Sequence, residues 1–528
     1  MPRLGRLALI VLEVVSLSAL ILAARCANYQ DVFIAGNVYY TDADCYARMT
    51  RVRLCLAHPG LVVRHHDFEN FPRGTTPHTT APFDYLIVVL SALLAPFTTH
   101  AVDLAGAMVS PFLALAGGWF LWGWARRMNF TYAWPMLILF AASPILVHGT
   151  ELGRPDHQSL LIVLLMVALC AEWSLLANVS QGWSMTAGCA WGLALWVSLY
   201  EPLILLALVV LLSSLRPAAP ETGLFSRYRR RGWLCFLVVV LLALLVERRL
   251  PSFSGLVTEL YGKNWMRSLG ELHAVPLLSL TWFRWASCLV AALPLLIWLG
   301  RASYFAEAAR GRRFVLLLGL LGATFLLTLW QARWGYFFAL VFVVALPFVL
   351  APFPRRWLVW AVFVFSLWPM AREWDERLWP NESEQRRRVT ERRERADLRE
   401  LAQALRSDDR HPLLAPWWLS PALVYWSGQP AVAGSSHESL AGITDSARFY
   451  AADNWQKARV IVENRQVDFV LAYNADRVAE VSAQILGHPV PEHAVCYLLD
   501  HAPAMSPRFL VLATQNPAGK IFRVANNR

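Results

Sequence analysis

Acidic residues lie in three polar segments of the sequence, each directly beside a long apolar stretch. The first segment contains Asp42 and Asp44, the second contains Asp156 with Gln158, and the third contains Glu271. Carboxylate and amide oxygens suit Mg²⁺ or Mn²⁺, and a positioned carboxylate can also take a proton from a reacting group. Acidic segments that meet at one place would therefore form a site for metal-assisted or acid–base chemistry.

Each segment taken alone has a simpler explanation. Two acids spaced like Asp42 and Asp44 are commonly solvated turn residues, and Asp156 precedes an apolar run that it could cap as a helix begins. A lone glutamate such as Glu271 is usually a surface residue. The chemical interpretation therefore depends on whether the three segments converge, which the sequence does not decide.

Arg333 lies in a very short polar turn, residues 331–333, between two apolar stretches. A cation that faces lipid at this depth is unfavourable, so the side chain needs an anionic partner. Either an acid within the helical bundle or a phosphate group would serve, because a guanidinium binds both through paired hydrogen bonds.

The composition requires a membrane around much of the chain. Of its 528 residues, 57% are hydrophobic and 16% are charged, which is more apolar surface than one soluble core buries. The net charge of +11 falls in short basic runs between apolar stretches, as topology signals do and nucleic-acid interfaces do not. About eleven stretches could span a bilayer: residues 7–24, 101–125, 132–147, 159–176, 183–199, 203–215, 233–246, 277–299, 314–330, 337–351 and 357–370.

Arginine clusters alternate along the chain and predict its orientation. The clusters at residues 3–6, 126–127, 227–231, 310–313 and 355–356 all fall on one side, which is expected to be cytoplasmic. The outer side then receives loops 25–100, 148–158 and 247–276 and everything after residue 370. We expect residues 1–371 to form the membrane domain, with residues 7–24 as a retained signal anchor and residues 83–97 as a helix on or dipping into the membrane surface.

The chain changes character after residue 371. Residues 372–410 form a charged linker in which 382–410 have helical spacing and predict a solvated helix. Within residues 411–528, the segment 440–466 favours a helix, and 467–472, 508–513 and 520–525 favour strands, which predicts a small α/β domain. Cys45 and Cys55 share the first polar segment and could form a disulfide.

The order and context of these motifs resemble the catalytic subunits of oligosaccharyltransferases, in the C-type (GT-C) superfamily of membrane glycosyltransferases. The resemblance rests on Asp44 to Tyr46 with the basic residues that follow, on residues 71–84, on Asp156 to Gln158, and on Ser268 to Glu271. It implies a mainly α polytopic helical membrane domain with about 11–13 spans, followed by a small extracytoplasmic α/β domain.

The resemblance also implies roles for individual residues. Asp44, Asp156 and Gln158 would hold Mg²⁺ or Mn²⁺, and Asp44 with Glu271 would orient or activate the acceptor. Arg333 stands in the place of an arginine that contacts the donor phosphate. Trp417 and Trp418 resemble the start of the family's Trp-Trp-Asp-Tyr-Gly motif and would contact the acceptor, although a packed aromatic pair at the start of a strand is the alternative.

Two departures from the family pattern bear on function. Gln158 replaces an anionic or imidazole ligand, which weakens the metal site. Residues 419–421 are Leu, Ser and Pro in place of Asp, Tyr and Gly, which removes the carboxylate that helps to hold the acceptor hydroxyl in the family. The first departure concerns metal affinity and the second concerns the acceptor.

The leading expectation is an enzyme that transfers a glycan, with inversion, from a polyprenyl diphosphate to a protein asparagine on the outer side of a membrane, such as the bacterial inner membrane. The alternative keeps the fold and the metal but uses a polyprenyl-monophosphate sugar to modify a lipid, a polysaccharide or a protein hydroxyl. A third hypothesis is a lipid-linked sugar flippase, which expects charges inside the spans, whereas most charges here lie in the outer segments. The expected partners are the lipid-linked donor, the acceptor and the bilayer, with no nucleic acid.

Overall fold

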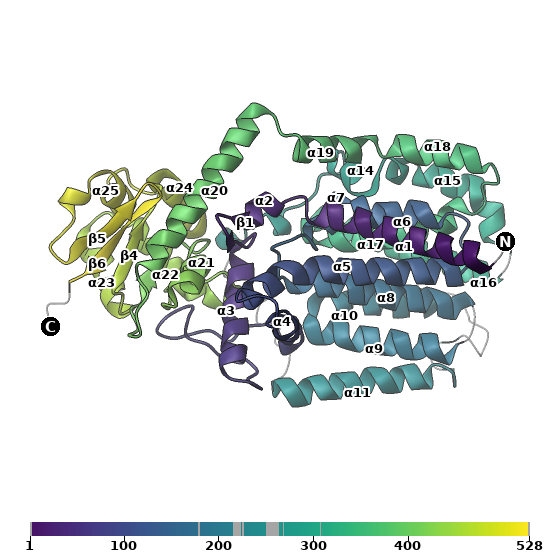
Figure 1. Cartoon of the computed structure of the whole chain (residues 1–528), viewed down its shortest axis with the longest axis horizontal. Coiled ribbons are helices and arrows are strands. Elements are labelled where there is room, and N and C mark those ends of the chain that lie inside the picture. Colours follow the sequence, from purple (N-terminus) through teal and green to yellow (C-terminus); the bar gives the residue numbers. More distant parts are fainter. Residues whose placement is uncertain are drawn as a thin grey trace. The chain divides into compact units, whose positions relative to one another are not determined.

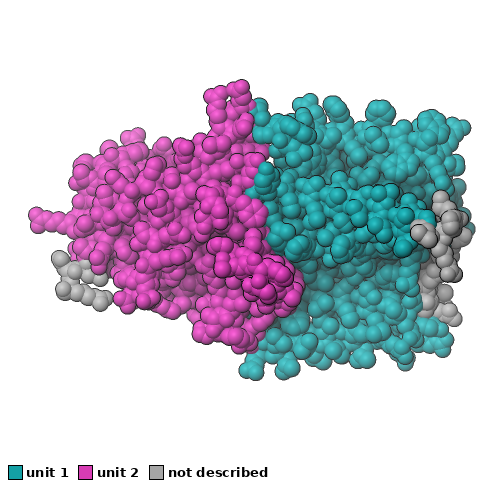
Figure 2. Space-filling model, viewed as in Figure 1, with its two compact units in different colours: residues 1–29, 108–249, 271–381 teal, residues 30–107, 250–270, 382–528 magenta. Residues whose placement is uncertain are grey.

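The computed structural model describes residues 3–177, 180–214, 223, 226–249, 263–267, 269–306 and 308–525. Its contacts group these residues into two compact units, coloured teal and magenta in Figure 2. Unit 1 comprises residues 1–29, 108–249 and 271–381, and unit 2 comprises residues 30–107, 250–270 and 382–528. Ser268, part of the predicted Ser-x-x-Glu motif, lies outside the described residues.

Unit 1 is a bundle of apolar helices (Figure 1), as expected where a backbone must satisfy its own hydrogen bonds in lipid. Its elements are α1 (Arg3–Arg25), most of α5 (Ala101–Arg127), α6 (Ala133–Ala142), α7 (Pro144–His148), α8 (His157–Ala177), α9 (Gln181–Val197), α10 (Tyr200–Ser214), α11 (Arg230–Glu247), η1 (Gly270–Leu272), whose first residue belongs to unit 2, α14 (Thr281–Ala286), α15 (Leu289–Tyr304), α16 (Ala308–Trp330), η2 (Ala332–Trp334), α17 (Gly335–Leu350), α18 (Arg356–Ser366) and α19 (Trp368–Leu378).

Every apolar stretch predicted as a span is mainly helical in its described residues, but three stretches are divided. Residues 132–147 break at Ser143 before Pro144, residues 277–299 break at Ser287, and residues 357–370 break at Leu367 before a proline. Proline lacks the backbone N–H that would continue the preceding helix, and Ser287 has a positive φ of 63°. In the described part of the chain, five helices are long and apolar enough to cross a membrane: Gly5–Arg25, Ala101–Arg127, His157–Leu176, Gly311–Trp330 and Ala332–Leu350.

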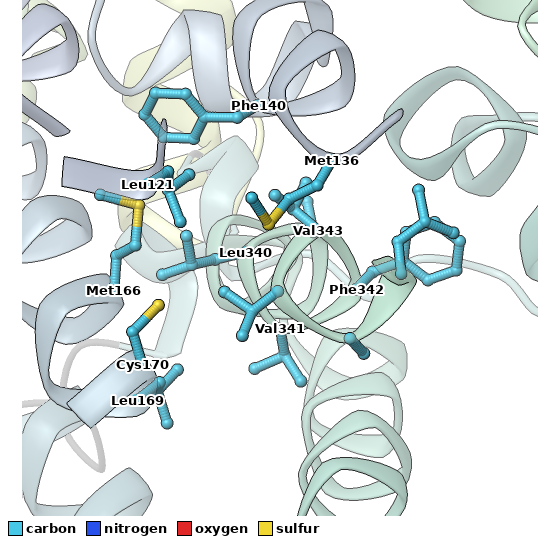
Figure 3. Close-up of a cluster of buried hydrophobic side chains, with 14 of the residues drawn as sticks. Leu121, Met136, Phe140, Met166, Leu169, Cys170, Leu340, Val341, Phe342 and Val343 are labelled. Atoms are coloured by element: carbon cyan, nitrogen blue, oxygen red, sulfur yellow. The ribbon is translucent and has the colours of Figure 1, made fainter. Parts of the chain in front are cut away.

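Helix α17 forms the centre of unit 1, and all 16 of its residues are buried. Leu340 to Val343 pack among side chains from α5, α6 and α8, including Met136, Phe140 and Met166 (Figure 3). A helix that is apolar on every face is stable inside protein or in lipid, and the burial of all 16 residues shows that protein surrounds this one. This packing fixes the position of the short η2 turn, which directly precedes α17 and carries Arg333.

Unit 2 combines the first polar segment of the chain with its C-terminal part. Its elements are α2 (Tyr29–Val32), whose first residue belongs to unit 1, β1 (Phe33–Ile34), β2 (Asn37–Val38), α3 (Ala43–Ala57), α4 (Ala81–Leu94), the first residues of α5, α13 (Lys263–Met266), α20 (Glu382–Gln403), β3 (Leu413–Leu414), α21 (Ser420–Ser427), η3 (His437–Ser439), α22 (Leu440–Tyr450), α23 (Trp455–Asn464), β4 (Phe469–Ala472), α24 (Ala475–Leu486), α25 (Val495–His501), η4 (Pro503–Met505), β5 (Leu510–Asn516) and β6 (Gly519–Val524).

The C-terminal sheet has the strand order β3-β4-β6-β5. Strands β3 and β4 are parallel, and the other two pairings are antiparallel, with Val470 opposite Phe522 in the β4–β6 pair. Helix α20 packs against β5 and β6. The predicted α/β domain and its three predicted strands are confirmed.

Three local expectations are wrong. The helix predicted over 440–466 is two helices, because Asn454 caps α23 by accepting a hydrogen bond from the Lys457 backbone at 3.0 Å. The helix predicted over 382–410 ends at Gln403, before the polar stretch 407–409. Cys45 and Cys55 cannot pair, since ten residues along one helix, α3, separate them by about 15 Å, well beyond the reach of a disulfide.

Candidate active site

The loop that carries Asp156 is held by a polar network within unit 1. His148 lies with Nδ1 2.7 Å from the Tyr336 hydroxyl, and Arg154 contacts both His148 (3.1 Å) and Glu151 (3.3 Å). Glu151 also accepts a hydrogen bond from Arg377 at 2.6 Å. Charge-assisted contacts of this kind restrict the loop, so the backbone before Asp156 has a defined path.

Asp156 and Gln158 lie at the start of α8. The Asp156 carboxylate is 2.7 Å from His157 Nδ1, while its backbone carbonyl accepts hydrogen bonds from both the N–H and the hydroxyl of Ser159. Gln158 is 5% exposed, and its Oε1 has no hydrogen-bond partner among the described residues. A buried amide oxygen without a partner is unfavourable. This oxygen is therefore suited to bind a ligand.

Arg333 lies between two carboxylates of unit 1. Its Nη2 is 2.7 Å from Glu201 Oε1, and its Nη1 is 3.7 Å from Glu271 Oε1. Asp156 is also within electrostatic range of the guanidinium, and the Tyr200 ring centre lies 5.8 Å from it. Unit 1 therefore brings together three predicted site residues, Asp156, Glu271 and Arg333, from segments far apart in the sequence.

Glu201 is the main partner of Arg333, and little in its sequence context singles it out. Its side chain is fully enclosed at the start of α10, where Ser198 donates a hydrogen bond to Oε2 at 2.8 Å. A carboxylate inside an apolar segment requires a cation. The available signal was the position of Glu201 at the start of an apolar stretch. Arg333 needs an anionic partner, and an acid in that kind of position can supply it.

Asp44 lies in unit 2, in the first turn of α3. Asp42 caps this helix through a hydrogen bond from the Cys45 N–H at 3.0 Å, which gives Asp42 a structural role. Asp44 is exposed. Helix α3 is fixed from its other side, because Arg48 and Arg51 bind the buried Asp84 carboxylate at 2.8 and 3.4 Å.

A histidine–glutamate pair lies near Asp44. Glu438 Oε1 accepts hydrogen bonds from both the backbone N–H of His78 (3.1 Å) and its ring Nδ1 (2.9 Å). Burial opposes ionisation of Glu438, but the charge and the hydrogen bond of His78 outweigh it and lower the pKa of Glu438 to about 2. Partial desolvation lowers the pKa of His78, whereas Glu438, with a smaller contribution from Asp44, raises it above its usual value. Both shifts favour the charged forms of the pair.

Aromatic contacts lead from this pair to the two predicted acceptor residues. His437 stacks on His78 at 5.5 Å, Trp265 packs against His437 at 5.7 Å, and Trp417 packs against Trp265 at 6.0 Å. The sequence by itself assigns no role to His78 or His437. Only the folded chain places them between Asp44 and Trp417, because hundreds of residues separate the contacting segments.

Trp417 and Trp418 lie between β3 and α21 rather than at the start of a strand, but their rings pack against each other at 6.2 Å, as the packed-pair alternative expects. The indole N–H groups of both residues have no acceptor among the described residues, and the Arg477 guanidinium lies 5.3 Å from the Trp418 ring centre. Ser420, which follows the pair, is buried and donates its hydroxyl to the Ala415 and Pro416 carbonyls at 3.1 and 3.0 Å. The position after the tryptophans thus offers no carboxylate.

The predicted metal ligands are divided between the units, Asp44 in unit 2 and Asp156 with Gln158 in unit 1. Among the residues that the structure describes, no three His, Cys, Asp or Glu side chains are grouped closely enough to hold a metal ion. An amide is outside that set, however, and the unpartnered Oε1 of Gln158 two residues from Asp156 is a hard oxygen donor. These two residues fit Mg²⁺ or Mn²⁺ better than a soft metal.

Comparison with known proteins places these features in context. No known family model matches the sequence. A curated relative, the dolichyl-phosphooligosaccharide-protein glycotransferase 1 of Archaeoglobus fulgidus, is 26% identical over 165 residues, which cover 30% of this chain and 27% of that protein. The match thus spans about a quarter of the relative's length.

Solved membrane protein structures share the fold over nearly the whole chain. The Archaeoglobus fulgidus oligosaccharyltransferase tethered with an acceptor peptide containing the NVT sequon is 14% identical, with a TM-score of 0.65 over 98% of this chain and 74% of that one. The complex of that oligosaccharyltransferase with Zn and sulfate gives a TM-score of 0.62 at 13% identity, over 97% of this chain and 73% of that one. ArnT from Cupriavidus metallidurans bound to undecaprenyl phosphate is 15% identical, with a TM-score of 0.58 over 98% of both chains.

These likenesses show the fold. The predicted fold class, a helical membrane domain of GT-C type followed by a small α/β domain, is confirmed, and so is the predicted resemblance to oligosaccharyltransferases. The chain is an integral membrane protein.

Proposed function

We propose that this membrane protein, which shares its fold with oligosaccharyltransferases and ArnT, is a glycosyltransferase that moves a glycan from a polyprenyl-(di)phosphate donor to a protein acceptor. The observation that carries the proposal is the meeting of Asp156, Glu271 and Arg333 in unit 1. A cation beside acidic residues at the start of apolar helices suits a phosphate headgroup whose lipid tail stays in the bilayer. The curated relative's name, a glycotransferase, supports the same activity.

In this proposal the chain positions both substrates and neutralises the departing phosphate. The guanidinium of Arg333 hydrogen-bonds to the phosphate oxygens, which stabilises the charge that develops as the sugar–oxygen bond breaks. Asp44 and Glu271 orient the acceptor and take the proton that it loses. Attack opposite the leaving phosphate inverts the anomeric centre, and the surrounding protein keeps water away.

Asp44, Asp156 and Gln158 are the residues proposed to hold Mg²⁺ or Mn²⁺. The metal supplies a Lewis acid for the phosphate oxygens when it is bound. The hard oxygen set favours these ions, and the unpartnered Gln158 oxygen supports the assignment. That a related oligosaccharyltransferase structure contains Zn and sulfate is consistent with a divalent metal but leaves its identity to experiment.

The proposed arrangement in the membrane follows the arginine clusters. Residues 1–371 form the catalytic membrane domain, and residues 372–410 link it to the module 411–528. The outer loops and this module lie on the extracytoplasmic side, which in a bacterium is the periplasmic face of the inner membrane, because the basic clusters all fall on the opposite side of the predicted spans. Trp417 and Trp418 contact the acceptor there.

A second candidate is transfer from a polyprenyl-monophosphate sugar to a hydroxyl of a lipid, a polysaccharide or a protein. A specific observation favours it. The Ser420 hydroxyl donates to backbone carbonyls nearby, and no carboxylate follows the tryptophans to hold the hydroxyl of a sequon. ArnT, whose solved structure contains undecaprenyl phosphate, also matches this chain over 98% of both lengths.

The test uses the purified full chain in detergent with a labelled polyprenyl-diphosphate oligosaccharide and an Asn-x-Thr peptide. Parallel reactions contain Mn²⁺ or a chelator, and Asp44→Ala is the control variant. Metal-dependent glycosylation of the peptide that is lost in the variant is the expected result. Transfer only from a monophosphate donor to a hydroxyl acceptor would replace the peptide hypothesis by the second candidate, and absence of turnover with every donor would reject both.

A further inference from the structure

The two carboxylates around Arg333 hold it unequally. Glu201 is fully enclosed and lies 2.7 Å from Nη2, whereas the Glu271 side chain is 49% exposed and lies 3.7 Å from Nη1. Arg333 itself is 18% exposed at its side chain. One partner is therefore buried and close, and the other is solvated and distant.

Glu201 has the geometry of a permanent anchor. Ser198 donates a hydrogen bond to its second oxygen at 2.8 Å. This contact holds the carboxylate in place independently of Arg333. A buried charge that loses its partner is strongly unfavourable because it cannot recover its hydration. Any ligand that approaches Arg333 must therefore leave the contact with Glu201 in place.

Glu271 has the geometry of an exchangeable partner. It lies in the short 3-10 turn η1 and keeps half of its side-chain surface in contact with solvent. The pair with Arg333 contributes little, because Glu271 is hydrated when the two groups separate and Arg333 keeps Glu201 as its partner. The departure of Glu271 would open Nη1 to another anion at small cost.

Arg333 also has donor capacity that the described residues do not use. Its Nε is buried and has no hydrogen-bond partner among them. Buried N–H groups are rarely left unsatisfied, and a phosphate, which offers several acceptor oxygens, is a suitable partner for a guanidinium that has an unused donor. This unused nitrogen is independent of the unequal ion pairs and points to the same kind of ligand.

We propose that Glu201 is the positioning residue of Arg333 and that the donor phosphate replaces Glu271 on the guanidinium. The phosphate takes the Nη1 donor that Glu271 leaves, while Glu201 retains Nη2. Donor binding thereby releases the Glu271 carboxylate, which then faces the acceptor only when a donor is in place. This inference rests on the proposed function and adds an order of binding, donor before acceptor.

Direct binding of undecaprenyl phosphate to the full chain in detergent tests the exchange without requiring turnover. The variant Glu271→Gln removes the competing carboxylate and is expected to bind the lipid phosphate about two- to fivefold more tightly, even if its transferase activity falls. Glu373→Gln is the matched control, since it removes one carboxylate from another partly exposed ion pair of unit 1, with Arg284 at 2.9 Å. It should leave the affinity unchanged. Unchanged or weaker binding by Glu271→Gln would overturn the exchange.

The positioning role of Glu201 needs a variant that keeps the charge. Glu201→Asp draws the anchor back by one methylene and is expected to weaken undecaprenyl phosphate binding several-fold and to raise the donor KM with little change in kcat. A purely structural role would instead reduce the amount of folded protein and leave the affinity of the remainder unaltered. If the wild type binds the lipid and Glu271→Gln binds it more tightly while no donor supports transfer, the exchange stands and the proposed function fails.

Discussion

Glu69→Gln is expected to stabilise unit 2 at pH 8 and to have little effect at pH 5. Glu69 is 1% exposed and faces the 434–439 segment of the C-terminal module, where Gly434 is required because a Cβ there would lie 2.7 Å from the Glu69 carboxyl carbon. Burial raises the pKa of Glu69 from 4.5 to about 7, against the opposing charge of Arg51 and the hydrogen bonds from Ser435 and Ser439. The negative charge of Glu438 adds to the rise.

The sign follows from proton binding. The folded chain keeps a proton on Glu69 between pH 4.5 and about 7, whereas the unfolded chain releases it, so stability falls as the pH rises through this window. One pKa unit corresponds to about 1.4 kcal/mol. The raised pKa of Glu69 therefore costs about 3 kcal/mol of stability at pH 8 and less than about 1 kcal/mol at pH 5.

Glutamine has nearly the shape of a protonated glutamate and carries no charge, so it removes this cost. At about 2–4 °C per kcal/mol for a domain of this size, the Tm of the variant should exceed that of the wild type by roughly 5–12 °C at pH 8. Thermal unfolding followed by tryptophan fluorescence in detergent measures the difference at both pH values. Glu492→Gln, an exposed substitution in the same unit, is the control. A gain that is equal at both pH values, or a loss at pH 8, would refute the reasoning.

Three other substitutions have defined outcomes. Glu438→Gln should destabilise unit 2 by ~1–3 kcal/mol at pH 7. Because the pKa of Glu438 is lowered to about 2, the difference in Tm between the wild type and the variant should shrink as the pH falls from 4.5 toward 2. A difference that stays constant would contradict the ion pair with His78. Arg333→Gln should lower stability by ~3–5 kcal/mol because it leaves Glu201 buried and unpaired, and Arg333→Gln combined with Glu201→Gln should recover much of that loss; equal losses in the single and double variants would exclude the coupling. Gln158→Asp adds a carboxylate to the proposed metal site and should lower the Mn²⁺ concentration for half-maximal activity by about tenfold, whereas an unchanged requirement would remove Gln158 from the ligand set.

The sequence was sufficient for the elements of the fold whose signal is local. An apolar run such as 337–351 predicts a helix wherever it packs, and α17 occupies that run with all 16 residues buried. The failures are also local in origin, since a cap at Asn454 or a break at Ser143 depends on one or two residues within a long favourable pattern. The strand 467–472 was recognisable from its β-branched and aromatic residues, whereas its pairing with β6 was not.

The candidate site was predictable in residue type but not in arrangement. The need of Arg333 for an anion followed from the apolar stretches on either side, yet the choice of Glu201 over every other acid is made by the packing of α10 against α16, the helix that leads into η2. The sequence interpretation assigned no role to His78, because its partner Glu438 lies 360 residues away. No periodicity relates positions so far apart.

The amino-acid sequence by itself determined that the chain enters a membrane, which stretches become helices and that a small α/β module follows, because hydropathy and backbone propensity act over a few neighbouring residues. Tertiary structure alone decided that the first polar segment belongs to the same compact unit as the C-terminal module, where Arg465 hydrogen-bonds to Asn70 at 3.0 Å. It also decided which carboxylate neutralises Arg333 and which one remains exchangeable. Ion pairing and burial depend on distances between segments remote in sequence, and those distances exist only after the chain has folded.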